Sequence, residues 1–517
     1  MDASVPPLIQ QMLVPSFYDH AVEAPIQLLQ THISYVLLTG DYAYKVKKPA
    51  NFGFLDFTTL DKRHQFCQEE LRLNRRLSPE IYLEVVGIGE RQGQYQIHAK
   101  DTEAVEYAVK MRQFPQQELF SQLFAKEALT RQDMETLAQQ VAQFHAQAAS
   151  NAEIQSYGTV EAVQQVDENN YGLSEQFIGI SQTQEQLDQT RDFTRSLFRD
   201  HPDWFTDRLA QGKIRECHGD LHLNNICRFQ GQIQVFDCIE FNQEFRNIDV
   251  MYDVAFLVMD LEYLGRPDLA NAFLNTYLEQ TGDYDGAKLL PLYLSMRAYI
   301  RGNVSSLALN DPAIASEVKA EFLAKAKAYY QLAWRYTQRP QGQLFLMSGV
   351  SGSGKSTVAR QLAATKNAIQ IRSDAVRKHL AGIPLQERGA QAQDFGGGIY
   401  TPEMTQKTYE ELLRLGLILA QQGWRVILDA KYDRQDLREK AIAAAAAQGI
   451  SLQILHCTAA PETIRGRLDQ RTGDIADATA DILDQQLASY ESFSEAEQPL
   501  VQEIHTAQAL APQLTSL

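Results

Sequence analysis

Two segments of the chain combine the residue types that phosphate chemistry needs. The first, residues 218–225, reads His-Gly-Asp-Leu-His-Leu-Asn-Asn and is followed by Asp237. A carboxylate at Asp220 could orient an attacking hydroxyl and accept its proton, while Asn225 and Asp237 offer the oxygen ligands that Mg²⁺ prefers. Because these residues stand in the order and spacing of a phosphoryl-transfer loop, they predict such a site rather than a polar turn between helices.

The second segment, residues 349–357, reads Gly-Val-Ser-Gly-Ser-Gly-Lys-Ser-Thr and fits G-x-x-x-x-G-K-[ST]. Its glycines let backbone N–H groups surround phosphates, Lys355 reaches the β- and γ-oxygens, and Ser356 binds Mg²⁺. An apolar run at residues 344–347 precedes it and a helix follows it, as this motif requires. The pattern predicts an ATP site formed by Gly349, Gly352, Ser353, Gly354, Lys355, Ser356 and Thr357.

Two aspartates downstream of this loop are candidates for the same site. Asp374 follows a predicted strand at residues 369–371 and could meet an acceptor hydroxyl, with Arg372 and Arg377 on either side attracting an anionic acceptor. Asp429 ends the apolar strand of residues 424–429 and could lie near the metal. The alternative for both is an aspartate that caps a helix.

Arg467 and Arg471 are a further candidate pair. They stand four residues apart, so in a helix they share one face. From a closing lid they could neutralise charge on the transferring phosphoryl group. The alternative is ordinary surface charge paired with Asp469 and Asp474.

The elements that position the first segment include a small sheet. Residues 25–112 predict strands with one helix among them, and Gly40-Asp41 predicts a hairpin turn. Lys45 and Lys47 alternate onto one strand face. We expect Lys45 to bind the phosphates and Glu70 of the helix to hold it, with Lys47 and Glu69 as alternatives. The predicted strands are 25–31, 35–39, 42–47, 95–98 and 105–111, and the predicted helix is 61–77.

The rest of the chain divides once more. Helical periodicity dominates residues 117–334, with one strand-rich island near residues 226–239. A polar stretch with Pro340 and Gly342 then marks a boundary. The predicted domains are residues 1–336 and 343–517, joined by a linker at 337–342. A small sheet lobe followed by a larger helical lobe is typical of two-lobed kinases.

Composition limits the partners. The 517 residues carry 48 Lys and Arg against 65 Asp and Glu, a net charge of −17. Such acidity disfavours nucleic acid and anionic membranes, and it would tolerate a cationic substrate such as an amine-bearing sugar. The five cysteines form no metal-binding or C-x-x-C spacing and predict reduced thiols. With no targeting or membrane-spanning segment in view, we expect a cytoplasmic protein.

Residues 25–335 resemble the aminoglycoside phosphotransferase family. The resemblance rests on residues 218–225 and Asp237, and it implies a catalytic role for Asp220 and metal binding by Asn225 and Asp237. It also implies that Asp249 and Asp253 brace the catalytic loop. The sequence departs from a G-x-G-x-x-G loop at residues 30–34, Gln-Thr-His-Ile-Ser, so Ser34 and backbone donors would contact phosphate there.

Residues 343–495 resemble small P-loop kinases of the gluconate kinase, polynucleotide 5′-kinase and zeta-toxin kind. The whole chain resembles a bacterial family of bifunctional phosphotransferase and ATP-binding proteins. The implied fold is a two-lobed α+β kinase-like domain followed by an α/β P-loop NTPase domain with a parallel sheet. The implied function is transfer of phosphate from ATP, with Mg²⁺, to a hydroxyl of a small molecule.

Two other functions stay open. The front domain could be a non-catalytic receptor regulated by a P-loop ATPase switch. The rear domain could act on a polynucleotide 5′ end, although it has no basic stripe interleaved with aromatic residues. The sequence does not indicate the acceptor of either domain.

Overall fold

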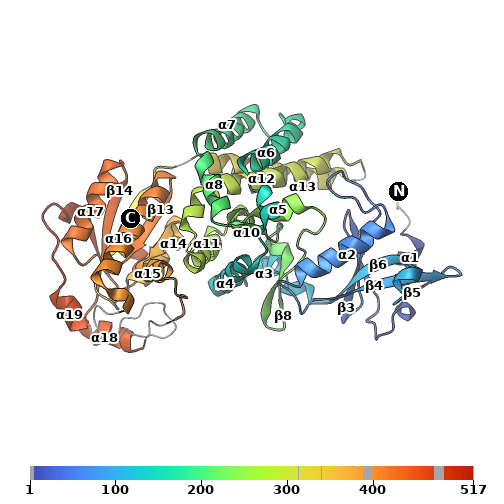
Figure 1. Cartoon of the computed structure of the whole chain (residues 1–517), viewed down its shortest axis with the longest axis horizontal. Coiled ribbons are helices and arrows are strands. Elements are labelled where there is room, and N and C mark those ends of the chain that lie inside the picture. Colours follow the sequence, from blue (N-terminus) through green and yellow to red (C-terminus); the bar gives the residue numbers. More distant parts are fainter. Residues whose placement is uncertain (1–4, 313, 339, 388–397, 471–482, 516–517) are drawn as a thin grey trace. The chain divides into compact units, whose positions relative to one another are not determined.

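The computed structural model describes residues 5–312, 314–338, 340–387, 398–470 and 483–515 (Figure 1). These residues form two compact units. The first unit comprises residues 1–130, 143–260 and 296–333, and the second comprises residues 131–142, 261–295 and 334–517. Each unit is a kinase-type fold, and the predicted fold class is confirmed.

The first unit contains a six-stranded antiparallel sheet in the order β1-β2-β3-β6-β4-β5. Helix α2 packs against β4 and β6, and the buried Cys67 and Val109 lie in their shared core (Figure 1). The Thr59 hydroxyl caps α2 by accepting a hydrogen bond from the Lys62 N–H at 3.3 Å. The elements are β1 (Gln27–Gln30), β2 (Ser34–Leu38), β3 (Tyr42–Lys47), α2 (Leu60–Asn74), β4 (Tyr82–Arg91), β5 (Gln94–Ile97) and β6 (Ala104–Arg112).

Strand β4 was not predicted. Gly87 and Gly89 interrupt its apolar pattern, and glycine weakens the strand signal. The fold needs a small residue here, because a Cβ at Gly87 would lie 2.6 Å from the Ala99 carbonyl oxygen. The same close approach therefore explains both the glycine and the missed strand.

Helices follow the sheet in sequence, and two short strand pairs lie among them along the chain. Strand β8 (Ile226–Phe229) pairs with β9 (Gln232–Val235), and β7 (Ile214–Glu216) pairs with β10 (Asn247–Asp249). No helix of the described residues has both the length and the apolar character to cross a bilayer. Helices of the chain before the predicted linker also include α1 (Pro7–Met12), α3 (Phe120–Ala125), α4 (Arg131–Gln147), α5 (Ala152–Ser156), α6 (Val160–Ser174), α7 (Gln184–Asp200), α8 (Pro202–Ala210), α9 (Gln243–Arg246), α10 (Val250–Tyr263), α11 (Pro267–Thr281), α12 (Leu290–Leu307) and α13 (Ser316–Thr337).

The second unit contains a five-stranded parallel sheet in the order β12-β13-β11-β14-β15. Side chains of β11 alternate between two covered faces. Phe345 shares a core with Val358 and Leu362 of α14, whereas Leu344 lies beside Gly416 of α16. The elements are β11 (Gln343–Ser348), α14 (Lys355–Lys366), β12 (Ile369–Arg372), α15 (Ser373–Ala381), α16 (Pro402–Gln421), β13 (Arg425–Asp429), α17 (Gln435–Ala447), β14 (Ser451–Thr458), α18 (Pro461–Asp469), α19 (Leu483–Ala488), β15 (Val501–His505) and α20 (Leu510–Thr515).

Helix α11 precedes the predicted linker in sequence but lies in the second unit. The Asn275 side chain donates to the Ala368 carbonyl at 3.0 Å and accepts from the Gln370 N–H at 2.7 Å. Asn271 donates to the same Ala368 carbonyl at 2.9 Å. These amides satisfy backbone groups of β12, which is an edge strand of the sheet. The domain boundary at residues 337–342 stays a prediction.

Candidate active sites

Two lysines and three carboxylates meet at the sheet of the first unit. Lys45 Nζ lies 2.8 Å from Glu70 Oε1 and 2.6 Å from Asp237 Oδ1. Lys47 Nζ lies 2.6 Å from Glu70 Oε2 and also contacts Glu240. Strand alternation places both lysines on one face, so Glu70 joins them both.

Burial distinguishes the two lysines. Lys47 and Glu70 are fully buried, whereas the Asp237 side chain is 45% exposed. Burial raises the pKa of Glu70, but the two lysines lower it more and bring it to about 2. Burial lowers the pKa of Lys47, yet Glu240 and Glu70 raise it above its ordinary value. Lys45 therefore stands at the open end of the cluster, next to Asp237, and Lys47 at the closed end.

The predicted catalytic loop has a definite geometry around Asp220. The Asn225 side-chain amide donates to Asp220 Oδ2 at 2.9 Å, and His222 Nε2 lies 3.3 Å from the same oxygen. Among the described residues, Asp220 Oδ1 accepts no hydrogen bond and is available to a hydroxyl group. Burial raises the pKa of Asp220, but the charge of His222 and its hydrogen bond lower it by more than burial raises it. The pKa of Asp220 therefore lies below its ordinary value, and the carboxylate is ionised. Sequence reasoning did not assign His222 a role.

Asp253 braces this loop. Its carboxylate accepts hydrogen bonds from the backbone N–H groups of His218 at 3.1 Å and Gly219 at 2.8 Å. His145 Nε2 lies 3.0 Å from the same carboxylate. Asp249, the other member of the expected pair, binds Arg208 instead, at 2.6 and 2.8 Å. Nothing near His145 in the sequence signals its contact, because the two partners are 108 residues apart.

The oxygen atoms at the open end of the cluster suit Mg²⁺. The Asn225 side-chain amide donates its N–H groups to the Asp220 carbonyl and to Asp220 Oδ2. The Asn225 side-chain oxygen, Oδ1, therefore has no hydrogen bond among the described residues. The half-exposed Asp237 carboxylate supplies further oxygens. Ser34 is fully buried, and its hydroxyl has no hydrogen-bond partner among the described residues. Its contact with phosphate, together with backbone donors, stays a prediction.

The P-loop of the second unit has the expected backbone. Gly349, Gly352 and Gly354 have φ values of +136°, +79° and +94°, a region that favours glycine. Lys355 Nζ donates to the carbonyls of Gly349 at 2.9 Å and Val350 at 2.8 Å. The buried Ser353 hydroxyl has no hydrogen-bond partner among the described residues, and Ser356 and Thr357 open α14. This donor set suits a phosphate group.

One loop donor is already engaged. The Ser351 N–H donates to Gln486 Oε1 of α19 at 2.8 Å. Gln486 is a contact that the sequence did not reveal, because it lies 135 residues away.

Asp429 and Asp374 lie near this loop. Asp429, at the end of β13, accepts from the Gln370 side chain at 2.9 Å and lies 3.9 Å from Arg372 Nε. Burial lowers the pKa of Lys355, and the charges of Asp429 and Asp374 oppose that shift. Both aspartates are therefore within electrostatic reach of Lys355.

The expected arginines are engaged within the protein. Arg377 is buried and donates to Thr405 Oγ1 at 3.1 Å, so it holds α16 against α15. Arg467 donates to Thr506 Oγ1 and to the Thr506 carbonyl, both at 2.9 Å. A Cβ at Gly354 would lie 2.9 Å from Thr506 Cβ, so this arginine fixes the end of β15 behind the P-loop. Arg471 lies outside the described residues.

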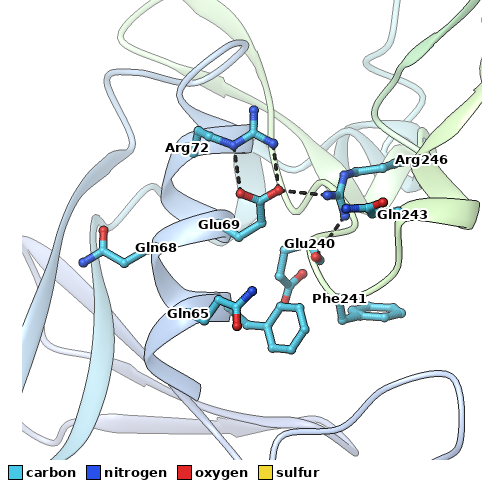
Figure 2. A pocket seen from close by; sticks show the side chains of 9 residues that line it. Gln65, Gln68, Glu69, Arg72, Glu240, Phe241, Gln243 and Arg246 are labelled. Atoms are coloured by element: carbon cyan, nitrogen blue, oxygen red, sulfur yellow. Dashed lines mark hydrogen bonds and ion pairs between the residues drawn. The ribbon is translucent and has the colours of Figure 1, made fainter. Parts of the chain in front are cut away.

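A cavity of about 700 Å³ lies beside α2 in the first unit (Figure 2). On its wall Arg72 and Arg246 both bind the Glu69 carboxylate. Glu69 thus pairs with arginines on the cavity wall, whereas Glu70 is the glutamate that contacts Lys45.

Comparison with known proteins identifies both units. A family described as Phosphotransferase enzyme family matches residues 54–290, and a family described as AAA domain matches residues 344–493. Proteins of Mycobacterium tuberculosis and Mycobacterium bovis, both described as uncharacterized, are 30% identical over 459 residues, 88% of this chain and of each relative. The chain belongs to their family of two-domain phosphotransferase and P-loop kinase-like proteins.

Solved structures resemble each part. A choline/ethanolamine kinase family protein from Mesorhizobium loti is 11% identical with a TM-score of 0.39 and covers 64% of this chain and 97% of its own. A gluconokinase from Sinorhizobium meliloti is 21% identical with a TM-score of 0.25 and covers 34% of this chain and 90% of its own.

Proposed function

We propose that this kinase-type protein transfers the γ-phosphate of ATP to hydroxyl groups of small molecules at two separate Mg²⁺-dependent sites. The observation that carries the proposal is the cluster in which Lys45 joins Glu70 to Asp237, beside an Asp220 with one uncommitted carboxylate oxygen.

In the first unit, Lys45 would hold the phosphates while Glu70 fixes its position. Asn225 and Asp237 would hold Mg²⁺, which neutralises charge on the phosphates. Asp220 Oδ1 would orient the acceptor hydroxyl and take its proton as the hydroxyl oxygen bonds to the γ-phosphorus and the bond to ADP breaks. The low pKa of Asp220 favours orientation over strong basicity.

In the second unit, Lys355 and the loop N–H groups would hold the phosphates, with Ser356 and Asp429 at the metal. Asp374, in the first turn of α15, would meet the acceptor hydroxyl. Because Arg377 and Arg467 bind protein groups, we propose for them a positioning role around this site.

The test uses the full-length chain with Lys355→Ala, so that only the first site is active. Transfer of labelled γ-phosphate to pooled metabolites is measured beside nucleotide affinity. We expect Asp220→Asn to lower transfer about 100-fold or more and to leave affinity nearly unchanged. Asp200→Asn, at an exposed aspartate of the same unit, is the control. Equal transfer by the two variants would reject the site.

A further inference from the structure

Two arginines of α12 lie next to the catalytic loop of the first unit. Arg297 and Arg301 are one helical turn apart, and their guanidinium groups lie 4.8 and 5.9 Å from the centre of the Phe256 ring. The His222 ring meets the same phenylalanine edge-on at 5.3 Å. The two arginines and His222, the residue that contacts Asp220, therefore all lie around Phe256.

Neither arginine has a counter-ion. Among the described residues, no carboxylate oxygen lies within 4.0 Å of either guanidinium. Arg297 donates through Nε to the Tyr252 carbonyl at 3.2 Å, while its buried Nη2 has no hydrogen-bond partner in the described chain. The buried Arg208 of this unit differs, since it binds the Asp249 carboxylate in two places. A partly buried cation without a counter-ion costs free energy unless a ligand neutralises it.

Arg301 is the more accessible of the two and is electrostatically coupled to the catalytic carboxylate. Burial lowers the pKa of Arg301, but Tyr329, Asp220 and Asp260 raise it overall. Asp260 itself accepts the Leu223 N–H at 3.1 Å and makes no ion pair with Arg301.

We propose that Arg301 binds an anionic group, a phosphate or a carboxylate, on the acceptor whose hydroxyl is placed at Asp220. Guanidinium groups bind both anions through paired N–H donors. An amine at this position would meet the unneutralised Arg301, so the amine-bearing acceptor suggested by net charge is disfavoured. This inference rests on the proposed transfer reaction of the first unit.

The test measures binding by calorimetry on the full-length chain saturated with Mg²⁺ and a non-hydrolysable ATP analogue, so that nucleotide sites are filled. The probes are inorganic phosphate, malonate and glucosamine. We expect phosphate or malonate to bind saturably. The probe that binds more tightly would indicate whether the anionic group of the acceptor is a phosphate or a carboxylate. Arg301→Gln should weaken that binding about 10-fold or more, and Arg301→Lys should restore part of it. Arg199→Gln, an exposed arginine of the same unit, is the control.

Two outcomes would overturn the proposal. One is anion binding that is absent or equal in the wild type and Arg301→Gln. The other is saturable glucosamine binding without anion binding. Because the assay needs no turnover, Arg301-dependent binding without Asp220-dependent transfer would reject the reaction and keep the anion site. Asp220-dependent transfer without Arg301-dependent binding would reject only the acceptor class.

Discussion

The two candidate sites hold their lysines in different ways. Lys45 of the first unit is bound by carboxylates of α2 and of the segment after β9. Lys355 of the second unit donates only to carbonyls of its own loop among the described contacts, and burial lowers its pKa. The first cluster is therefore neutralised by distant parts of the chain, whereas for Lys355 we expect the phosphates of a bound nucleotide to supply the strong counter-charge. This difference predicts how each site fails.

Lys355→Ala should give the largest loss. We expect ATP affinity of the second unit to fall about 100-fold or more, because the loop loses the cation that meets the β- and γ-oxygens. Asp374→Asn should keep that affinity and stop transfer to a hydroxyl. Nucleotide titration beside product formation separates the two variants, and Arg360→Ala, on the exposed side of α14, is the control. Equal loss of ATP binding in Lys355→Ala and Asp374→Asn would place Asp374 at the metal.

The two lysines of β3 should separate function from folding. Lys45→Met removes the cation beside Asp237, so we expect ATP affinity to fall about 10-fold or more with a modest loss of stability. Lys47→Met leaves the buried Glu70 and Glu240 without that partner, which costs about 3–5 kcal/mol of unfolding free energy. Denaturant unfolding and nucleotide binding measure both. The distinction between the two lysines would be wrong if Lys47→Met kept the stability of the wild type and showed only a loss of ATP affinity.

Helix α11 sharpens the domain boundary. We expect protease cleavage at residues 337–342 to leave the two fragments associated, because Asn271 and Asn275 bind β12. Asn275→Ala should weaken that association and cost about 2–3 kcal/mol, since the Gln370 N–H loses its acceptor. Gel filtration of the nicked chain and calorimetry test this, with Thr276→Ala as the control on the same helix. Clean separation of the wild-type fragments would place the boundary where the sequence predicts it.

Asp253 should give the smallest effect, a contribution to stability that the protein loses in acid. Burial raises its pKa, but the hydrogen bond and charge of His145 lower it from the ordinary 3.8 to about 2. Between these values the unfolded chain binds more protons, so stability rises with pH there. The contribution, about 2 kcal/mol, is present above about pH 4 and lost towards pH 2. Asp253→Asn should flatten this part of the stability curve, and an unchanged slope would contradict the assignment.

The sequence predicted what short segments encode. The P-loop needs only nine consecutive residues, and the loop from His218 to Asn225 only eight, so both could be recognised directly. The sequence favoured Lys45 but kept Lys47 as an alternative, because strand alternation puts both lysines on one face and the difference in their burial is a property of the folded chain. The fold class could be predicted from the sequence because each half contains a short motif typical of its own fold, residues 218–225 in the first and residues 349–357 in the second.

Other features depend on contacts between distant residues. Arg301 is a single arginine in a helix, and only the absence of a nearby carboxylate in three dimensions distinguishes it. The role of Arg467 in a lid stays a prediction, and the sequence did not reveal that Thr506, 39 residues away, accepts its hydrogen bonds. Helical spacing predicts which residues share a face of a helix, but it does not predict which distant residues that face contacts.

The amides of α11 have a consequence for recombination between related genes. The family match to the phosphotransferase extends to residue 290 and so includes α11, although the polar side chains of this helix cap a strand of the P-loop sheet. A crossover at the linker would combine the P-loop sheet of one protein with helix α11 of another. That helix need not carry the amide side chains that bind the backbone at Ala368 and Gln370. A chimera that exchanges the rear kinase should therefore carry residues 261–295 with it, and its natural junctions lie inside the helical lobe.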